Sequence, residues 1–320
     1  MVKDKLAVVF PGQGAQRPGM GKDFYDNIPI SRKTYDEASD AVSWDVAAMC
    51  FGEDERLNLT EFTQPCILTT EIAMLRGLHH LFGFSPSLFG GHSLGEFSAL
   101  VAAGVLPLSE VVRIVQIRGQ LMQKAVPVGI GGMAAIIYDN VDVDLIQRSL
   151  RELPLDLANI NSLNQVVISG KKEALPEAES KLTAALSKDK SFRFVPLNVS
   201  APFHSHFMDT IVDSFQEILL SIAKDWDAEK ATAVTSNYSG RFHAGTQESV
   251  VNNLVLQLNH AVQWVDNMKN LTARADKIFE VGPGRPLRDF FRTIDVFCSS
   301  IINLSSAERL LAMNDSKSEQ

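Results

Sequence analysis

Gly90-Gly91-His92-Ser93-Leu94-Gly95-Glu96 is the stretch that decides how this chain folds. It follows the short apolar run Ser87-Leu88-Phe89 and precedes a segment with helical spacing of apolar residues. A serine at a sharp strand-to-helix turn needs neighbours without Cβ atoms, and Gly91 and Gly95 meet that need. The pattern predicts a nucleophile elbow, with the positive end of a helix beside the Ser93 hydroxyl. A simple small-residue turn before a buried helix would use the same residue types, so other motifs are needed to distinguish the two interpretations.

Composition indicates a globular, soluble protein. The chain has 320 residues, of which 45% are hydrophobic, so a sizeable core can form. Its formal net charge is −8 and it has no dense run of lysine or arginine, which argues against nucleic acid and anionic membranes as partners. An acidic small substrate would therefore need a local cation.

The cysteines and apolar runs indicate the compartment. Cys50, Cys66 and Cys298 are odd in number and far apart, so we expect no disulfide framework and no zinc site, and a reducing cytoplasm fits best. The run Leu6–Phe10 is too short for a signal-peptide core, and the run Ala99–Leu108 is too short to span a bilayer. We therefore expect neither an export signal nor a membrane segment.

Apolar runs and helical patterns alternate along the chain, which predicts an α/β fold. Leu6–Phe10 has the pattern of a buried parallel strand, and it ends at the glycine-rich loop Pro11-Gly12-Gln13-Gly14. That loop lacks the remaining residues of a dinucleotide or phosphate-binding motif, so we expect no nucleotide site. The pattern further predicts helices at Ser31–Val42, Pro65–Phe82, Leu108–Lys124, Phe207–Ile222, Val250–Leu258 and Val262–Ala273, and strands near Ala231–Thr235 and at Lys277–Val281.

Residues 128–199 have a different pattern, which predicts an inserted module. The expected order is a strand, a helix, two short strands, a helix and a strand, the βαββαβ order of a ferredoxin-like fold. We therefore predict a large α/β-hydrolase-like parallel-sheet subdomain made of residues 1–127 and 200–320, with a ferredoxin-like small subdomain of residues 128–199 inserted into it.

Arg118 stands out because it falls within the apolar stripe of the Leu108–Lys124 helix. A guanidinium taken out of water must meet an anion or several hydrogen-bond acceptors. It either pairs with an internal carboxylate, the more common arrangement, or awaits an anion from a ligand.

A serine nucleophile needs a base, and the histidines supply the candidates. His79 and His80 lie late in an amphipathic helix, His243 and His260 lie in segments that look like surface, and His92 would point away from the elbow hydroxyl. The loop Ser200-Ala201-Pro202-Phe203-His204-Ser205-His206 remains. His204 and His206 have a spacing that metal ligands also use, but no further cluster completes a metal site, so we predict none.

Several separated motifs resemble one family, the malonyl-CoA:acyl-carrier-protein transacylases, which are similar to the acyltransferase domains of polyketide synthases. The motifs occur in the family's order and span nearly the whole chain: Phe10-Pro11-Gly12-Gln13-Gly14-Ala15-Gln16, Gly91-His92-Ser93-Leu94-Gly95-Glu96, Gln116-Ile117-Arg118-Gly119, Gly132-Met133-Ala134-Ala135, Asn161-Ser162 with Gln165-Val166-Val167-Ile168-Ser169-Gly170, Ala201-Pro202-Phe203-His204-Ser205, Val262-Gln263-Trp264 and Glu280-Val281-Gly282-Pro283-Gly284.

The resemblance implies a role for each of eight residues. Ser93 is the nucleophile that carries the malonyl ester, His204 is the base, and the main-chain carbonyl of Gln263 orients the imidazole. The backbone N–H groups of Gln13 and Leu94 form the oxyanion hole. The residues expected to contact the substrate are Arg118, which binds the malonyl carboxylate, Phe203, whose ring excludes an α-methyl branch, and Asn161.

The resemblance also implies the partners. We expect malonyl-CoA and a holo acyl carrier protein as substrates, no cofactor, a cytoplasmic location, a monomer, and a role in fatty acid synthesis. Lys188, Lys190, Arg193, Arg285 and Arg288 are candidates for docking an acidic carrier, although ordinary surface charge would look the same. Three alternatives stay open: a transferase that serves a polyketide carrier, a serine esterase or thioesterase, and a catalytically silent carrier-binding module.

Overall fold

The computed structural model describes residues 4–127, 129–199 and 201–312. Its large subdomain is built on a parallel sheet with the strand order β2-β1-β7-β8. The strands are β1 (Leu6–Phe10), β2 (Leu88–Gly91), β7 (Lys277–Val281) and β8 (Cys298–Ile301). Strand β1 lies inside the sheet, next to β2 and parallel to it. The loop after β1 and the loop after β2, which contains Ser93, therefore lie side by side at the carboxyl edge of the sheet. In the register of the sheet Phe10 lies opposite Gly91.

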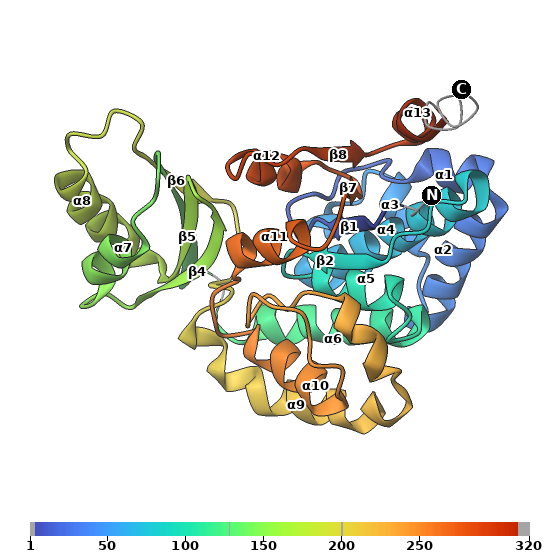
Figure 1. Cartoon of the computed structure of the whole chain (residues 1–320). Helices are drawn as coiled ribbons and strands as arrows, with labels where there is room; N and C mark the ends of the chain where they lie inside the picture. Colours follow the sequence, from blue (N-terminus) through green and yellow to red (C-terminus); the bar gives the residue numbers. More distant parts are fainter. Residues whose placement is uncertain (1–3, 128, 200, 313–320) are drawn as a thin grey trace.

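Both faces of this sheet are buried, which explains the continuous apolar run of β1. Val8 and Phe10 pack into one hydrophobic cluster, whereas Ala7 and Val9 pack into another on the opposite face. The first cluster draws on helices α1 (Lys22–Asn27), α2 (Pro29–Val42), α3 (Val46–Phe51), α4 (Thr60–Phe82), α5 (Gly95–Ala102), α6 (Leu108–Lys124), α9 (Asp209–Ile222) and α10 (Gln247–Leu256). The second draws on α11 (Trp264–Thr272) and α12 (Pro286–Arg292) (Figure 1). Helix α13 (Leu304–Ala307) follows β8.

The small subdomain is an antiparallel sheet with two helices on one face. Its elements are β3 (Gly131–Ile137), α7 (Val143–Leu150), β4 (Leu155–Ser162), β5 (Gln165–Lys171), α8 (Leu175–Ala185) and β6 (Arg193–Leu197), with the strand order β4-β5-β3-β6. Ala134 and Ile136 of β3 pack against α7 and α8, whereas Met133 and Ala135 belong to the core shared with the large subdomain. Figure 1 shows α7 and α8 on the side of the sheet away from the large subdomain.

The α/β class, the parallel sheet and the separate antiparallel subdomain are therefore confirmed. The proposed division of the chain at 128 and 200 falls on two residues outside the described part. The two subdomains are held together by backbone pairing, because Val262 N–H donates to the Ala158 carbonyl and Ile160 N–H donates to the Val262 carbonyl, each at 2.9 Å. This pairing joins the edge strand β4 to the segment that leads into α11.

Two expectations about strands were wrong. Residues Ala228–Ala233 form a 3-10 helix, and the predicted strand there shrinks to two isolated bridges, from Val234 to Phe89 and from Thr235 to Phe242. Strand β8 was missed, because Ser299 and Ser300 interrupt its apolar pattern and, at the sheet edge, are only partly buried. Helix α4 also begins five residues before Pro65, which lies within it.

Candidate active site

The turn between β2 and α5 holds Ser93 in a left-handed conformation, with φ of 53°. This conformation is uncommon for a residue with a side chain and marks a sharp strand-to-helix turn. The backbone passes so closely there that a Cβ atom on Gly91 would collide with the Gly95 carbonyl, and one on Gly95 would collide with the Phe10 carbonyl. Both glycines are therefore required, and the turn places the Ser93 hydroxyl at the carboxyl edge of the sheet.

His204 is positioned as the base for Ser93. Its Nε2 lies 2.8 Å from Ser93 Oγ, and its Nδ1 lies 2.7 Å from the backbone carbonyl of Gln257. The carbonyl can only accept, so Nδ1 carries the proton and Nε2 presents a lone pair to the serine hydroxyl. Burial, together with the nearby Arg118 cation, lowers the pKa of His204 to about 3, so the imidazole is neutral and ready to accept a proton.

The carbonyl that orients His204 belongs to Gln257, so the expectation that Gln263 would supply it was wrong. Gln263 lies at the start of α11, where its carbonyl accepts from the Asn267 N–H in the first helical turn. Gln257 lies at the C-terminal end of α10, where carbonyls lack helical partners and the dipole is negative. A helix end aimed at the imidazole favours the imidazolium that forms when Ser93 attacks.

Arg118 is buried without a carboxylate partner. Its side chain is 1% exposed, and within the described residues it forms no ion pair within 4 Å. Nη1 donates to Gln64 Oε1 at 3.0 Å, Nη2 donates to Gln257 Oε1 at 2.9 Å and to Ser93 Oγ at 3.4 Å, and Nε has no partner. Burial lowers the pKa of Arg118 to about 10, which leaves it charged at neutral pH. A cation held only by neutral groups is prepared for an anion.

The remaining expected site residues border the same cavity, which has a volume of about 620 Å³. This volume suits a small-molecule group. Gln13 and Leu94 border it, and their backbone N–H groups have no acceptor among the described residues, as an oxyanion hole requires. Phe203 and Asn161 border it too. Asn161 Oδ1 accepts from His92 Nε2 at 2.7 Å, and burial lowers the pKa of His92, so that histidine links the subdomains as a neutral donor.

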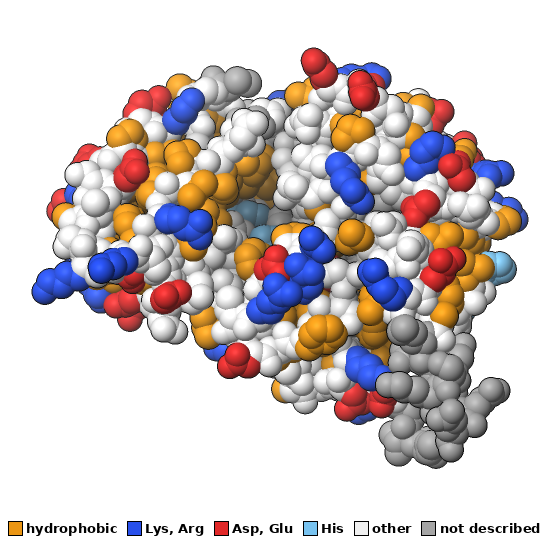
Figure 2. Space-filling model, turned by 90° about the horizontal axis from the view of Figure 1, so that it is seen from above, with side chains coloured by type: hydrophobic (Ala, Val, Ile, Leu, Met, Phe, Trp, Pro, Cys, Tyr) orange, Lys and Arg blue, Asp and Glu red, His pale blue; other side chains and the backbone are white. Residues whose placement is uncertain are grey.

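The cavity opens between the two subdomains. Figure 2 shows a hollow in this face with histidine side chains at its floor and lysine and arginine side chains around its rim. Met133 and Val167 of the small sheet border the cavity opposite the elbow. The small subdomain therefore supplies apolar side chains on the side of the cavity opposite the nucleophile, and these help to exclude water from an acyl ester.

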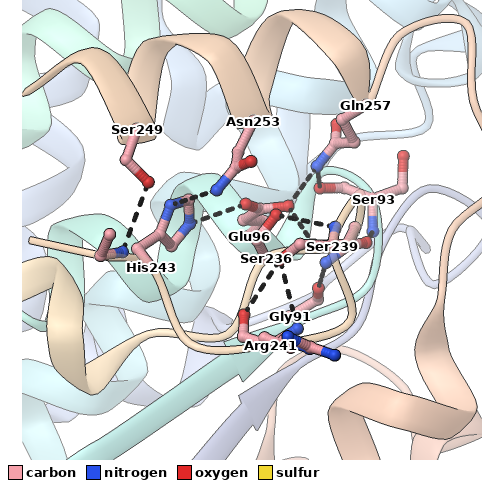
Figure 3. A network of polar contacts seen from close by, with 12 residues as sticks. Gly91, Ser93, Glu96, Ser236, Ser239, Arg241, His243, Ser249, Asn253 and Gln257 are labelled. Carbon is pink, nitrogen blue, oxygen red and sulfur yellow. Dashed lines mark hydrogen bonds and ion pairs between the residues drawn. The ribbon is translucent and has the colours of Figure 1, made fainter. Parts of the chain in front are cut away.

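Sequence reasoning missed the buried polar cluster behind the elbow. Glu96, His243, Gln257 and Asn237 are all buried and joined by hydrogen bonds (Figure 3). His243 was expected at the surface but is only 3% exposed. Its neighbour Arg241 gave it a polar setting in the sequence, and only the fold brings it to the Glu96 carboxylate. A glutamate inside an otherwise buried helix was the available signal.

Comparisons with known proteins show which proteins this chain is similar to. Residues 7–280 match the family described as the acyl transferase domain. A malonyl CoA-acyl carrier protein transacylase from Salmonella typhimurium is 37% identical over 308 residues, which cover 95% of this chain and 97% of that protein. The solved acyl-carrier-protein S-malonyltransferase from Burkholderia pseudomallei is 35% identical, with a TM-score of 0.88, and the match covers 96% of this chain and 99% of that one.

A second solved structure is a malonyl-transacylase in complex with a type II polyketide synthase acyl-carrier protein. It is 34% identical, with a TM-score of 0.89, and the match covers 97% of this chain and 100% of that one. None of the helices in the described part of this chain is both long and apolar enough to cross a membrane.

The depressed pKa of His204 predicts how acylation depends on pH. A base whose pKa lies well below the usual value of about 6.5 stays neutral in mildly acid solution. The single-turnover rate of Ser93 acylation should therefore hold its value below pH 6.5. Replacing Arg118 with Met removes a nearby cation and should move the acid limb to higher pH. An acid limb near pH 6.5 in the wild type would contradict this assignment.

Proposed function

The chain belongs to the acyl transferase domain family, and we propose that it transfers the malonyl group of malonyl-CoA to the phosphopantetheine thiol of an acyl carrier protein. The transfer proceeds in two steps through a malonyl ester on Ser93. Arg118 is the observation that carries the substrate assignment. A buried guanidinium without a carboxylate partner, 3.4 Å from the Ser93 hydroxyl, supports an acyl group that brings its own carboxylate.

In the first step His204 Nε2 takes the proton of the Ser93 hydroxyl as Oγ attacks the thioester carbon. The oxyanion receives hydrogen bonds from the N–H groups of Gln13 and Leu94, and one such donor contributes roughly 3 kcal/mol in a transition state. His204 then returns the proton to the departing CoA sulfur. The Gln257 carbonyl, 2.7 Å from Nδ1, steadies the imidazolium between these events.

In the second step the thiol of the carrier takes the place of CoA. It gives its proton to His204, attacks the ester carbon through the same oxyanion hole, and Ser93 leaves with a proton from the imidazolium. The ester must survive until the carrier arrives. The apolar side chains of Met133 and Val167 and the burial of His204 both favour that survival, and they argue against a simple esterase.

Removing the guanidinium tests the substrate assignment. Arg118→Ala should lower the acylation rate with malonyl-CoA about a hundredfold more than with acetyl-CoA, since about two charge-assisted hydrogen bonds are lost only for malonyl. Single-turnover acylation with each thioester measures the ratio. Arg118→Met, which keeps the volume, serves as the control for cavity effects and should give the same change in preference. Equal losses for both thioesters would reject the role of Arg118.

Phe203 limits the size of the acyl group in this proposal. Its side chain is 8% exposed, borders the cavity and directly precedes the catalytic His204. A ring at that position leaves little room for a methyl branch next to the thioester carbon. The enzyme should therefore use malonyl-CoA and reject methylmalonyl-CoA.

A smaller side chain should relax that limit. Phe203→Ser is expected to raise the ratio of methylmalonyl to malonyl transfer by about tenfold, the range that one methyl group in an apolar pocket gives. Competition between the two thioesters in one reaction measures the ratio directly. If the ratio stays at the wild-type value, Phe203 only packs the cavity wall.

The carrier partner is expected to be acidic, so the rim of the cavity should carry free cations. Arg193 on β6 and Arg285 before α12 are exposed, and in the described part of the chain neither forms an ion pair. Lys188 and Lys190 are exposed in the loop before β6. Arg288 is less available, because it pairs with Asp289 at 3.0 Å. We propose that Arg193 and Arg285 bind the carrier from opposite sides of the hollow.

Reversing one of these charges should weaken docking alone. Arg193→Glu is expected to raise the KM for the carrier and to flatten its dependence on salt, while acylation by malonyl-CoA stays at the wild-type rate. Transfer assays over a series of salt concentrations make the comparison, with Lys33→Glu on α2 as a matched charge reversal remote from the hollow. An unchanged KM and salt slope would remove Arg193 from the docking surface.

The proposed function also implies a compartment and a class of carrier protein. All three cysteines are free and buried, which suits the cytoplasm, where fatty acid synthesis would use the product. A carrier of polyketide synthesis is the alternative acceptor, and transfer assays with both carriers distinguish them. The acceptor with the higher kcat/KM is the physiological class.

A further inference from the structure

Three hydrogen-bond donors converge on the buried carboxylate of Glu96 (Figure 3). Oε2 accepts from Gln257 Nε2 at 2.6 Å and from the Asn237 backbone N–H at 2.9 Å, while Oε1 accepts from His243 Nε2 at 3.0 Å. An ionised carboxylate only accepts, so it satisfies three donors without conflict. The two carboxylate oxygens of Glu96 therefore match the donors of this cluster.

His243 adds no charge of its own to the cluster. Its Nδ1 accepts from Asn253 Nδ2 at 3.0 Å, so the ring proton lies on Nε2 and is donated to Glu96. The buried charges next to the nucleophile are then the Glu96 carboxylate and the Arg118 guanidinium. Within the described residues these two groups form no ion pair within 4 Å, and the amide of Gln257 lies between them.

The carboxylate decides which way the Gln257 amide points. An amide has one donating end and one accepting end, and Glu96 binds only the donating end. The accepting end, Oε1, must then face Arg118 Nη2, as it does at 2.9 Å. The backbone carbonyl of Gln257 also orients His204. The side-chain Nε2 of Gln257 donates to the Ser93 carbonyl at 3.1 Å as well.

We propose that Glu96 is a positioning residue for malonyl recognition. Its carboxylate acts through the Gln257 amide to hold the Arg118 guanidinium in the cavity. It balances the charge of the guanidinium and leaves the guanidinium donors free to bind the substrate carboxylate. A direct salt bridge would block the donors that the substrate needs, whereas a buried cation with no counter-charge would be costly. The intervening amide meets both requirements. This inference rests on the proposed malonyl transfer.

The matched test changes the charge of Glu96 and little else. Glu96→Gln keeps the size of the side chain but adds a donor that can turn the Gln257 amide away from Arg118. The ratio of malonyl to acetyl acylation rates should fall about tenfold or more, the effect of losing roughly one charge-assisted hydrogen bond. Glu71→Gln is the control, because Glu71 is equally buried on α4 but bonds Ser98 Oγ rather than the Gln257 cluster.

A double-mutant cycle separates positioning from general support of the elbow. In an Arg118→Ala background Glu96→Gln should leave the malonyl to acetyl ratio unchanged, because its effect passes through Arg118. Equal losses for both thioesters in the single variant, or a further loss of the ratio in the double variant, would overturn the inference. Wild-type protein that accepts no malonyl group would instead refute the proposed function itself.

Asn253→Ala keeps the inference testable if Glu96→Gln does not fold. Asn253 is only partly buried, and its loss removes the donor that fixes the proton on His243 Nε2. The expected result is a smaller drop of the malonyl to acetyl ratio in the same direction. A ratio equal to that of the wild type would overturn the role of the Glu96 cluster.

Discussion

The placement of one buried cation, the Arg118 guanidinium, governs the rest of this site. Helix α6 carries it into the core behind the elbow, where two glutamine carbonyl oxygens hold it and no carboxylate touches it within the described residues. The Glu96 carboxylate beyond the Gln257 amide balances this charge from a distance, so the donors of the guanidinium stay available for an anion. Because Ser93 Oγ lies 3.4 Å away, the anion and the reacting carbonyl must belong to one short acyl group.

Gln257 connects this cation to the catalytic pair. Its side-chain amide contacts Arg118, Glu96 and the Ser93 backbone, and its main-chain carbonyl orients His204. One residue at the end of α10 thus fixes both the recognition of charge and the proton transfer. The groups of Gln257 that contact Ser93, His204 and Arg118 are neutral, so the guanidinium remains available to the substrate.

Local sequence patterns predicted the fold and singled out Ser93, Arg118 and the loop of His204, because they record local constraints, whereas the other expected site residues came only from the family resemblance. The paired glycines around Ser93, the apolar β1 run and the βαββαβ order depend on neighbours in the chain, and the structure confirms the fold that they predict. Gln257 could not be chosen over Gln263, since the two differ only in which helix end presents a free carbonyl. His243 was misplaced because its partner Glu96 is 147 residues away in the sequence.

The most direct test of the account is the intact mass of the protein after brief mixing with malonyl-CoA in the absence of a carrier, measured beside Ser93→Ala. The account predicts a gain of one malonyl group in the wild type, no gain in the variant, and loss of the adduct when holo carrier protein is added. Steady release of CoA and malonate without an adduct would indicate a hydrolase, and no adduct with no turnover would indicate a silent carrier-binding module. Either result would contradict the account.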